Sequence, residues 1–151
     1  MERAPLAAGR YGADDVSIGD WIDCGSLTVT ADHILGFADL TGDRFEIHMS
    51  DEAAQRHCFD AQVAHGLLVL SLVDGLKNQA AAQFNARASK GWDWTFKAPV
   101  LAGDTIYARL SVLDKRPARQ DDQAVLVLEF SVSNQHGTLV QTGTNRLLVY
   151  R

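Results

Sequence analysis

The spacing of apolar residues changes near residue 90, and the two halves of the chain predict different secondary structure. Before that point the pattern favours helices. Thr30 is a good N-cap for a first helix, which begins at Ala31, and Gly42 is a natural terminator just after it. Ser50 can cap a second, short helix over residues 51–57.

A third and longer helix is expected from Gly66 to about Phe84. Its first turns are apolar on almost every side, which predicts a helix that is buried on most of its surface. The apolar residues are Leu67, Leu68, Val69, Leu70, Leu72 and Val73. The second half, residues 77–83, is polar enough to reach solvent.

After residue 90 apolar and polar residues alternate, which is the period of a β-strand. The expected strands cover residues 92–96, 106–112, 123–134 and 138–150, with a weaker strand at 21–29. One strand, then helices, then an antiparallel meander of about four strands predicts an α+β fold, a sheet of about five strands curled around the long helix. Such a sheet has a free edge, which pairing with an identical subunit would cover.

The chain has 151 residues and a formal net charge of −5, which fits one domain spanning residues 1–151. The acidic balance argues against nucleic acid or an anionic membrane as a partner. Residues 1–12 lack the apolar core of a signal peptide, and the longest apolar run is too short to cross a bilayer. Cys24 and Cys58 fit reduced thiols, so we expect a cytoplasmic protein.

The densest group of polar residues lies between the first two helices, in residues 40–48. Asp43 and His48 stand there on a glycine-flanked loop and could form an acid/base pair. The carboxylate can hold a water or orient the imidazole, which titrates near neutral pH. The same spacing also fits an aspartate bonded to backbone amides and a surface histidine.

A second candidate lies at the start of the long helix, in Ala64-His65-Gly66. A glycine lets a ligand approach the backbone, and the free amides of a helix N-terminus can stabilise negative charge on an oxygen. Gly66 could equally serve only a tight entry into the helix.

These segments resemble the MaoC-like dehydratases and (R)-specific enoyl-CoA hydratases. Three matches in the right order carry the resemblance, namely residues 37–48, 59–66 and 99–104. The resemblance implies a hot-dog fold and a homodimer or higher homo-oligomer. It also implies an acyl-CoA or acyl-carrier-protein thioester as substrate, bound near the subunit interface. We expect no metal or other cofactor, because the remaining histidines lack metal-ligand partners at suitable spacing, namely His33, His57, His65 and His136.

Position by position, Asp43 and His48 match the catalytic aspartate and histidine of that family. Gly66 matches the glycine whose backbone N–H binds the thioester carbonyl oxygen. The resemblance therefore implies that the pair holds a water against the β-carbon of a trans-2-enoyl thioester and delivers a proton to the α-carbon. The product would be the (R)-3-hydroxyacyl thioester, and the reverse reaction a dehydration.

The chain also departs from the family pattern. Phe45-Glu46 replaces an Asn-Pro, which puts a second carboxylate beside the pair, and Asp74 replaces a serine of the central helix. Phe45, His65 and Asp74 are the expected substrate-binding residues. Two alternatives stay open: an acyl-CoA thioesterase in which Asp74 activates water, and a non-catalytic subunit that binds acyl thioesters.

Three aromatic residues, Trp92, Trp94 and Phe96, alternate along the first expected strand after residue 90. We expect them to anchor the core or a dimer interface, with the lining of an acyl pocket as the alternative.

Overall fold

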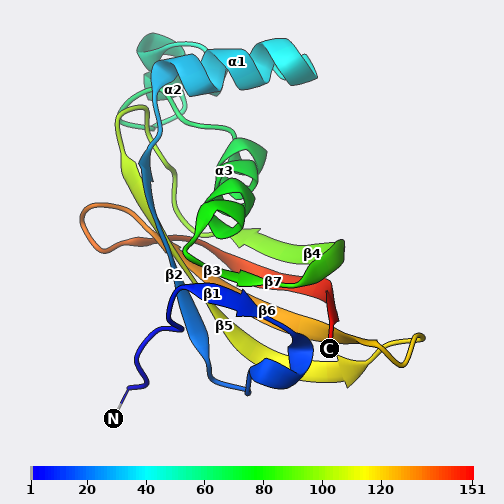
Figure 1. Cartoon of the computed structure of the whole chain (residues 1–151). Coiled ribbons are helices and arrows are strands. Elements are labelled where there is room, and N and C mark those ends of the chain that lie inside the picture. The colour runs from blue at the N-terminus through cyan, green and yellow to red at the C-terminus, as the bar shows by residue number, and fades with distance from the viewer. Residues whose placement is uncertain (1) are drawn as a thin grey trace.

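The computed structural model describes residues 2–151, and its centre is a five-stranded antiparallel sheet that curls around one helix, α3 (Figure 1). Helix α3 spans Gly66–Gln79. The strands of this sheet are β2 (Trp21–Thr28), β5 (Thr105–Pro117), β6 (Gln123–Ser133), β7 (Leu139–Tyr150) and β4 (Ala86–Phe96), in that spatial order. The predicted α+β arrangement is confirmed.

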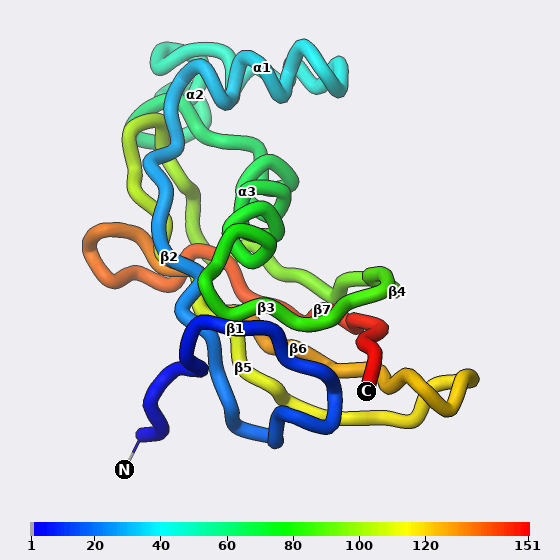
Figure 2. The backbone as a smooth tube through the Cα atoms, in the orientation of Figure 1, coloured from blue at the N-terminus to red at the C-terminus, as the bar shows by residue number. Residues whose placement is uncertain are grey.

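The remaining elements gather at two places. Helices α1 (Ala31–Thr41) and α2 (Asp51–Arg56) lie together at one end of the molecule, beyond the N-terminus of α3 (Figures 1 and 2), with the short 3-10 helix η2 (Glu46–His48) between them in sequence. The short strands β1 (Gly9–Tyr11) and β3 (Ala82–Phe84) pair in parallel, and the 3-10 helix η1 (Ala13–Asp15) follows β1.

The prediction for the end of the long helix is wrong. Helix α3 ends at Gln79, and residues 82–84 form strand β3 instead of a last helical turn. The cause is tertiary, because Ala82 and Phe84 are buried in the core while β3 pairs with the N-terminal strand β1. A helical pattern in the sequence cannot reveal a partner strand some 70 residues away.

Burial along α3 also differs from the expectation at both ends. Leu67, expected in the core, is 60% exposed, whereas Lys77, expected in solvent, is 7% exposed. Lys77 tolerates this position because its ammonium group is 2.8 Å from the Asp74 carboxylate and lies over the Trp92 ring. The buried side of α3 consists of Leu68, Val69 and Val73, besides Lys77.

The order of strands corrects the predicted four-stranded meander. Only β5, β6 and β7 follow one another as neighbours, because β4 pairs with β7 at the far edge of the sheet. The connection from β4 to β5 therefore crosses the end of the sheet. It is held to the segment before α3 by a bridge between Val63 and Leu101 and by the Ala64 amide, which donates to the Val100 carbonyl at 2.8 Å.

Within residues 2–151, no helix is both long and apolar enough to cross a membrane.

The pairing of β4 with β7 depends on a glycine. Gly143 of β7 lies opposite Trp94 of β4, and a Cβ at this position would overlap the Asp93 carbonyl and lie 2.8 Å from the Trp94 Cα. We expect Gly143→Ala to lower the free energy of unfolding by about 1–3 kcal/mol, because β4 must shift. Gly36→Ala in α1 is the control: its Cβ would meet nothing within 4 Å, and it should stabilise the helix by up to about 1 kcal/mol. Denaturant unfolding measures both free energies. An unchanged free energy of unfolding for Gly143→Ala would contradict the register of β4 with β7.

Candidate active site

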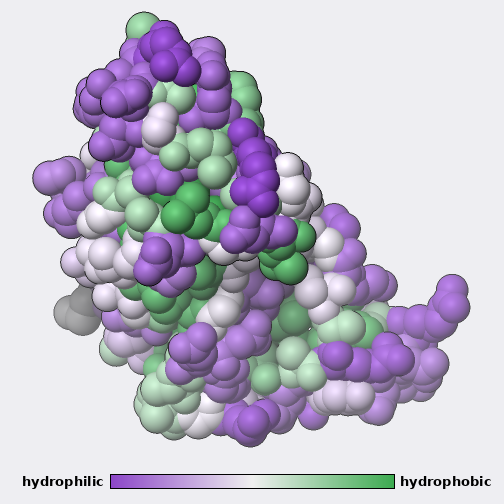
Figure 3. Space-filling view, turned by 90° about the horizontal axis from the view of Figure 1, so that it is seen from above, coloured by the Kyte–Doolittle hydropathy of each residue, from purple (hydrophilic) through white to green (hydrophobic). Residues whose placement is uncertain are grey.

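A cavity of about 510 Å³ opens where the loop after α1, the start of α3 and the β4–β5 connection meet. Its wall is mostly apolar, and the polar side chains of Asp43, His48, His65 and Gln141 contribute to it. Seen from the end that carries α1 and α2, the surface has an apolar area bordered by polar groups (Figure 3). A mostly apolar hollow with a few polar groups is typical of a small-molecule site.

Asp43 is positioned by the end of α1. Gly42 caps the helix in the left-handed conformation, with a φ of +79°, and turns the chain sharply after Thr41. The Thr41 hydroxyl accepts from the Asp43 amide at 3.1 Å and donates to the Phe37 carbonyl at 2.7 Å. The Asp43 carboxylate in turn accepts from the Phe45 amide at 3.2 Å. The Thr-Gly-Asp sequence thus fixes the loop while leaving Asp43 exposed to the cavity.

His48 sits in the 3-10 helix η2 and is buried. Its Nδ1 is 2.7 Å from the Val63 carbonyl oxygen. A carbonyl only accepts, so Nδ1 must carry the proton and Nε2 must carry the free lone pair. Burial holds the pKa of His48 below its ordinary value, and the neighbouring His65 acts in the same direction. A neutral imidazole with a free Nε2 is the form that a general base requires.

His65 links these groups. Its ring stacks on the His48 ring with a centroid distance of 3.9 Å and an interplanar angle of 26°. Its Nε2 donates to the Asp43 backbone carbonyl at 2.9 Å. His65 is also the residue immediately before α3, so it joins the Asp43 loop to the start of that helix.

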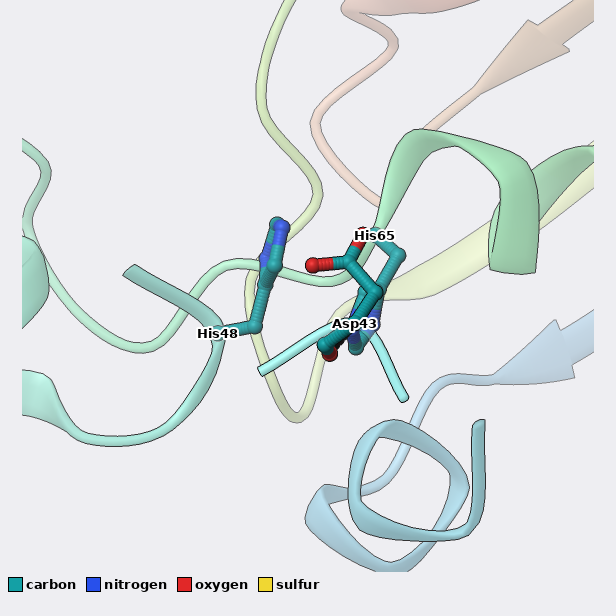
Figure 4. A group of neighbouring side chains, drawn as sticks. All are labelled: Asp43, His48 and His65. Atoms are coloured by element: carbon teal, nitrogen blue, oxygen red, sulfur yellow. Dashed lines mark hydrogen bonds between the residues drawn. The ribbon is translucent and has the colours of Figure 1, made fainter. Parts of the chain in front are cut away.

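The three side chains converge on one point, although they come from the loop after α1, from η2 and from the start of α3 (Figure 4). A carboxylate oxygen of Asp43 and ring nitrogens of His48 and His65 lie within 4.8 Å of one another. Across residues 2–151 no hydrogen bond joins the Asp43 carboxylate directly to the His48 ring. The pair can therefore share a small polar molecule between them.

The same residue types could in principle hold a metal ion, but their geometry does not suit one. The lone pair of an imidazole nitrogen lies in the plane of its ring. The His48 and His65 rings are stacked at 26°, so their in-plane lone pairs do not converge on one ion. One nitrogen of each ring is also engaged with a backbone carbonyl.

Gly66 is the first residue of α3 and lines the cavity. The first amides of a helix have no partner inside the helix, so they are free to bind an oxygen. Gly66 has a packing reason as well, since a Cβ there would overlap the Phe96 ring. A binding role and a packing role of this glycine are therefore compatible. Phe96, which is 54% exposed, lines the cavity instead of anchoring the core.

The substitution of Phe45-Glu46 has a local explanation. The Glu46 carboxylate accepts from His57 at 2.5 Å and from Arg56 at 3.2 Å, and the His57 hydrogen bond is the main cause that lowers the pKa of Glu46. The expectation of a second carboxylate beside the pair is therefore wrong, because Glu46 is bound to the end of α2. Phe45 is 54% exposed and packs edge-on against His48 and tilted against His57, outside the residues that line the cavity.

Asp74, like Phe45, is an expected substrate-binding residue that does not line this cavity. It lies further along α3, where its carboxylate pairs with Lys77 at 2.8 Å. Sequence reasoning missed Gln141, which lines the cavity although it comes from β7. No local signal identifies it, because only the register of the last strand places it there.

Burial of His48 has a consequence that can be measured directly. We expect its ring to stay neutral to a lower pH than ordinary histidine, so its titration midpoint should lie below about 6.5. A titration followed by the imidazole NMR signals, assigned with a His48→Gln variant, measures this midpoint. A midpoint at or above the ordinary value would contradict the buried environment described here.

Comparison with known proteins adds the following. The MaoC like domain family matches residues 17–133. The (R)-specific enoyl-CoA hydratase of Aeromonas caviae is 30% identical over 115 residues, which is 75% of this chain and 81% of that protein. The 3-hydroxybutyryl-CoA dehydratase of Methylorubrum extorquens is 30% identical over 97 residues, or 61% of this chain. The match spans only 58% of that dehydratase.

Solved structures agree. A monoamine oxidase regulatory protein from Archaeoglobus fulgius has a TM-score of 0.87 and 32% identity, covering 97% of this chain and 99% of its own. The (R)-hydratase of A. caviae has a TM-score of 0.74 and 26% identity, and the match covers 92% of this chain and 100% of that one. A Mycobacterium tuberculosis protein with a double hotdog fold has a TM-score of 0.81 and 20% identity. The match covers 96% of this chain and 46% of that one. The fold is therefore the expected hot-dog fold.

Proposed function

The chain belongs to the MaoC-like dehydratase family, and from this premise we propose that it hydrates trans-2-enoyl-CoA thioesters to (R)-3-hydroxyacyl-CoA, or catalyses the reverse dehydration. The observation that carries the proposal is the convergence of Asp43, His48 and the N-terminus of α3 on one cavity. The names of the two relatives that are 30% identical support the same reaction class.

The geometry suggests how the reaction would proceed. A water held between the Asp43 carboxylate and Nε2 of His48 adds its oxygen to C3 of the enoyl group and gives one proton to the pair. The electron pair of the C2–C3 double bond moves toward C1, so negative charge develops on the thioester oxygen. The Gly66 amide, at the start of α3, would donate a hydrogen bond to that oxygen. The proton taken by the pair is then delivered to C2, which completes the addition.

We propose that the protein assembles with a second copy of the chain. Strand β4 is an edge strand of the sheet, and most of its residues are exposed in the single subunit. An uncovered edge strand readily pairs with another chain, and a homodimer would cover it. The substrate would be an acyl-CoA or an acyl-carrier-protein thioester.

The thioesterase alternative assigns water activation to Asp74. Its carboxylate is paired with Lys77 and lies outside the residues that line the cavity, so no observation at this site favours that alternative.

The test is an incubation of the purified protein with crotonyl-CoA and, separately, with saturated butyryl-CoA, followed by separation of the products. We expect (R)-3-hydroxybutyryl-CoA from the first and no free CoA from the second. Free CoA from both esters would overturn the proposal in favour of a thioesterase. Tight binding of both esters without any product would instead identify a non-catalytic binding subunit.

A further inference from the structure

The side chain of Gln141 on β7 forms part of the cavity wall. Gln141 is only 2% exposed, yet it lines the cavity. Its Nε2 donates to the Gly66 carbonyl at 3.1 Å, and its Oε1 accepts from the Trp94 indole at 2.8 Å. Because the amide is held at both ends, moving it aside would leave buried polar groups unpaired, which is costly.

The Trp94 ring lies next to Gln141, because its indole N–H donates to Oε1 of that side chain. It packs over Gly143 of β7, where the absence of a Cβ leaves room for the indole. The same ring packs on Trp92 and Phe130, with centroid distances of 5.5 and 5.7 Å. These contacts form an aromatic layer beside Gln141, made of the rings of Trp92, Trp94 and Phe130.

Beyond this aromatic layer lies a buried charge. The Lys77 ammonium group is 5.6 Å from the Trp92 ring centroid and pairs with Asp74. Lys77 is buried, so an apolar acyl tail that reached this depth would have to pack against an ammonium group held out of water. Such contact is unfavourable for hydrocarbon and for the charge.

We propose that Gln141 and Trp94 form an end wall that restricts the substrate to short, crotonyl-sized acyl groups. The inference rests on the proposed function, in which the Gly66 amide anchors the thioester oxygen. Gln141 is hydrogen-bonded to the carbonyl of that same glycine, so the wall includes a direct neighbour of the residue whose amide would bind the thioester oxygen. The acyl carbons beyond C3 therefore meet the wall after a short distance.

The first experiment compares kcat/KM for crotonyl-CoA, trans-2-octenoyl-CoA and trans-2-dodecenoyl-CoA. We expect a fall of about 100-fold or more from the shortest to the longest ester. Equal values for crotonyl-CoA and the dodecenoyl ester would overturn the wall while leaving the proposed function intact.

Two substitutions of Gln141 separate its volume from its hydrogen bonds. Gln141→Ala removes the wall, so we expect the octenoyl-to-crotonyl ratio of kcat/KM to rise about tenfold. Gln141→Leu is the matched control, because it keeps a side chain of similar size and should keep the preference for the short ester. Thermal unfolding establishes that both variants are folded, and Trp94→Phe, which keeps most of the ring, should also preserve the preference. A rise in the ratio for Gln141→Leu equal to that for Gln141→Ala would contradict a steric wall.

A binding measurement makes the inference independent of turnover. Calorimetric titration with butyryl-CoA and octanoyl-CoA should show about tenfold tighter binding of the shorter ester to the unsubstituted protein, and a reduced or reversed difference for Gln141→Ala. If no enoyl ester is hydrated but this binding pattern holds, the proposed function fails and the wall stands. If octanoyl-CoA binds as tightly as butyryl-CoA, the wall is disproved whatever the activity.

Discussion

Asp43→Asn should reduce the turnover of crotonyl-CoA by about a thousandfold while leaving the free energy of unfolding nearly unchanged. The substitution keeps the shape of the side chain, and the amide oxygen of Asn can still accept from the Phe45 amide, as the carboxylate does at 3.2 Å. What is lost is the negative charge that holds and polarises the water. Initial rates and denaturant unfolding of the purified variant measure the two effects separately.

The control for this variant is Asp60→Asn, which neutralises an exposed aspartate outside the cavity. It should retain the rate and the stability of the unsubstituted protein. An Asp43→Asn variant with more than about a tenth of normal turnover would remove Asp43 from the reaction, since a positioned acid or base contributes at least about a hundredfold.

His48→Gln is expected to have an effect of similar size, a loss of about a thousandfold in kcat. A glutamine amide at this position can still donate to the Val63 carbonyl, as Nδ1 does at 2.7 Å, but it offers no lone pair that accepts a proton near neutral pH. The acid limb of the pH–rate profile, which reports protonation of this base, should therefore disappear in the residual activity. Steady-state rates across the acidic range test both statements.

His136→Gln provides the matched histidine control, because His136 is exposed and follows β6 in the turn that leads to β7. Its rate and pH profile should be those of the unsubstituted protein. The base assignment would be untenable if His48→Gln kept a normal rate, or if its acid limb stayed at the same pH. A melting temperature for each variant shows whether loss of activity comes with loss of structure, which matters because His48 is buried.

Elements whose boundaries depend on neighbouring residues were predictable from the sequence. The start of α1 follows from Thr30, whose side chain accepts from the His33 amide at 3.2 Å, and its end follows from the left-handed Gly42. Ser50 likewise caps α2 by accepting from the Ala53 amide at 3.1 Å. Because Asp43 and His48 lie between these two helices, the same local signals predicted that both residues stand in one short connection.

Features that depend on distant partners were not predictable in the same way. Strand β3 exists because the N-terminal strand β1 pairs with it, and β4 joins β7 rather than β5 at the sheet edge. Gln141 reaches the cavity by bonding to Gly66, 75 positions earlier in the chain. Periodicity within a segment cannot predict such contacts. The stacking of His65 on His48 also joins two separate segments, so it was not predictable either.

Under the proposed function, the cavity, the pair and the helix terminus form a site that adds water across an activated double bond, whereas the thioesterase alternative would cleave the thioester. The two reactions differ in the carbon that receives the oxygen of water: C3 in hydration and C1 in hydrolysis. In the proposed mechanism, Asp43 and His48 hold the water beside C3 while the Gly66 amide, at the first residue of α3, binds the thioester oxygen.

The most direct test of this central claim is the reaction of crotonyl-CoA in water enriched in oxygen-18, with mass spectrometry of the intact thioester product and its fragments. The account predicts 3-hydroxybutyryl-CoA that carries the heavy oxygen in its C3 hydroxyl group, formed by the unsubstituted protein and almost absent with Asp43→Asn. Free CoA together with crotonic acid that carries the label in its carboxylate would contradict it.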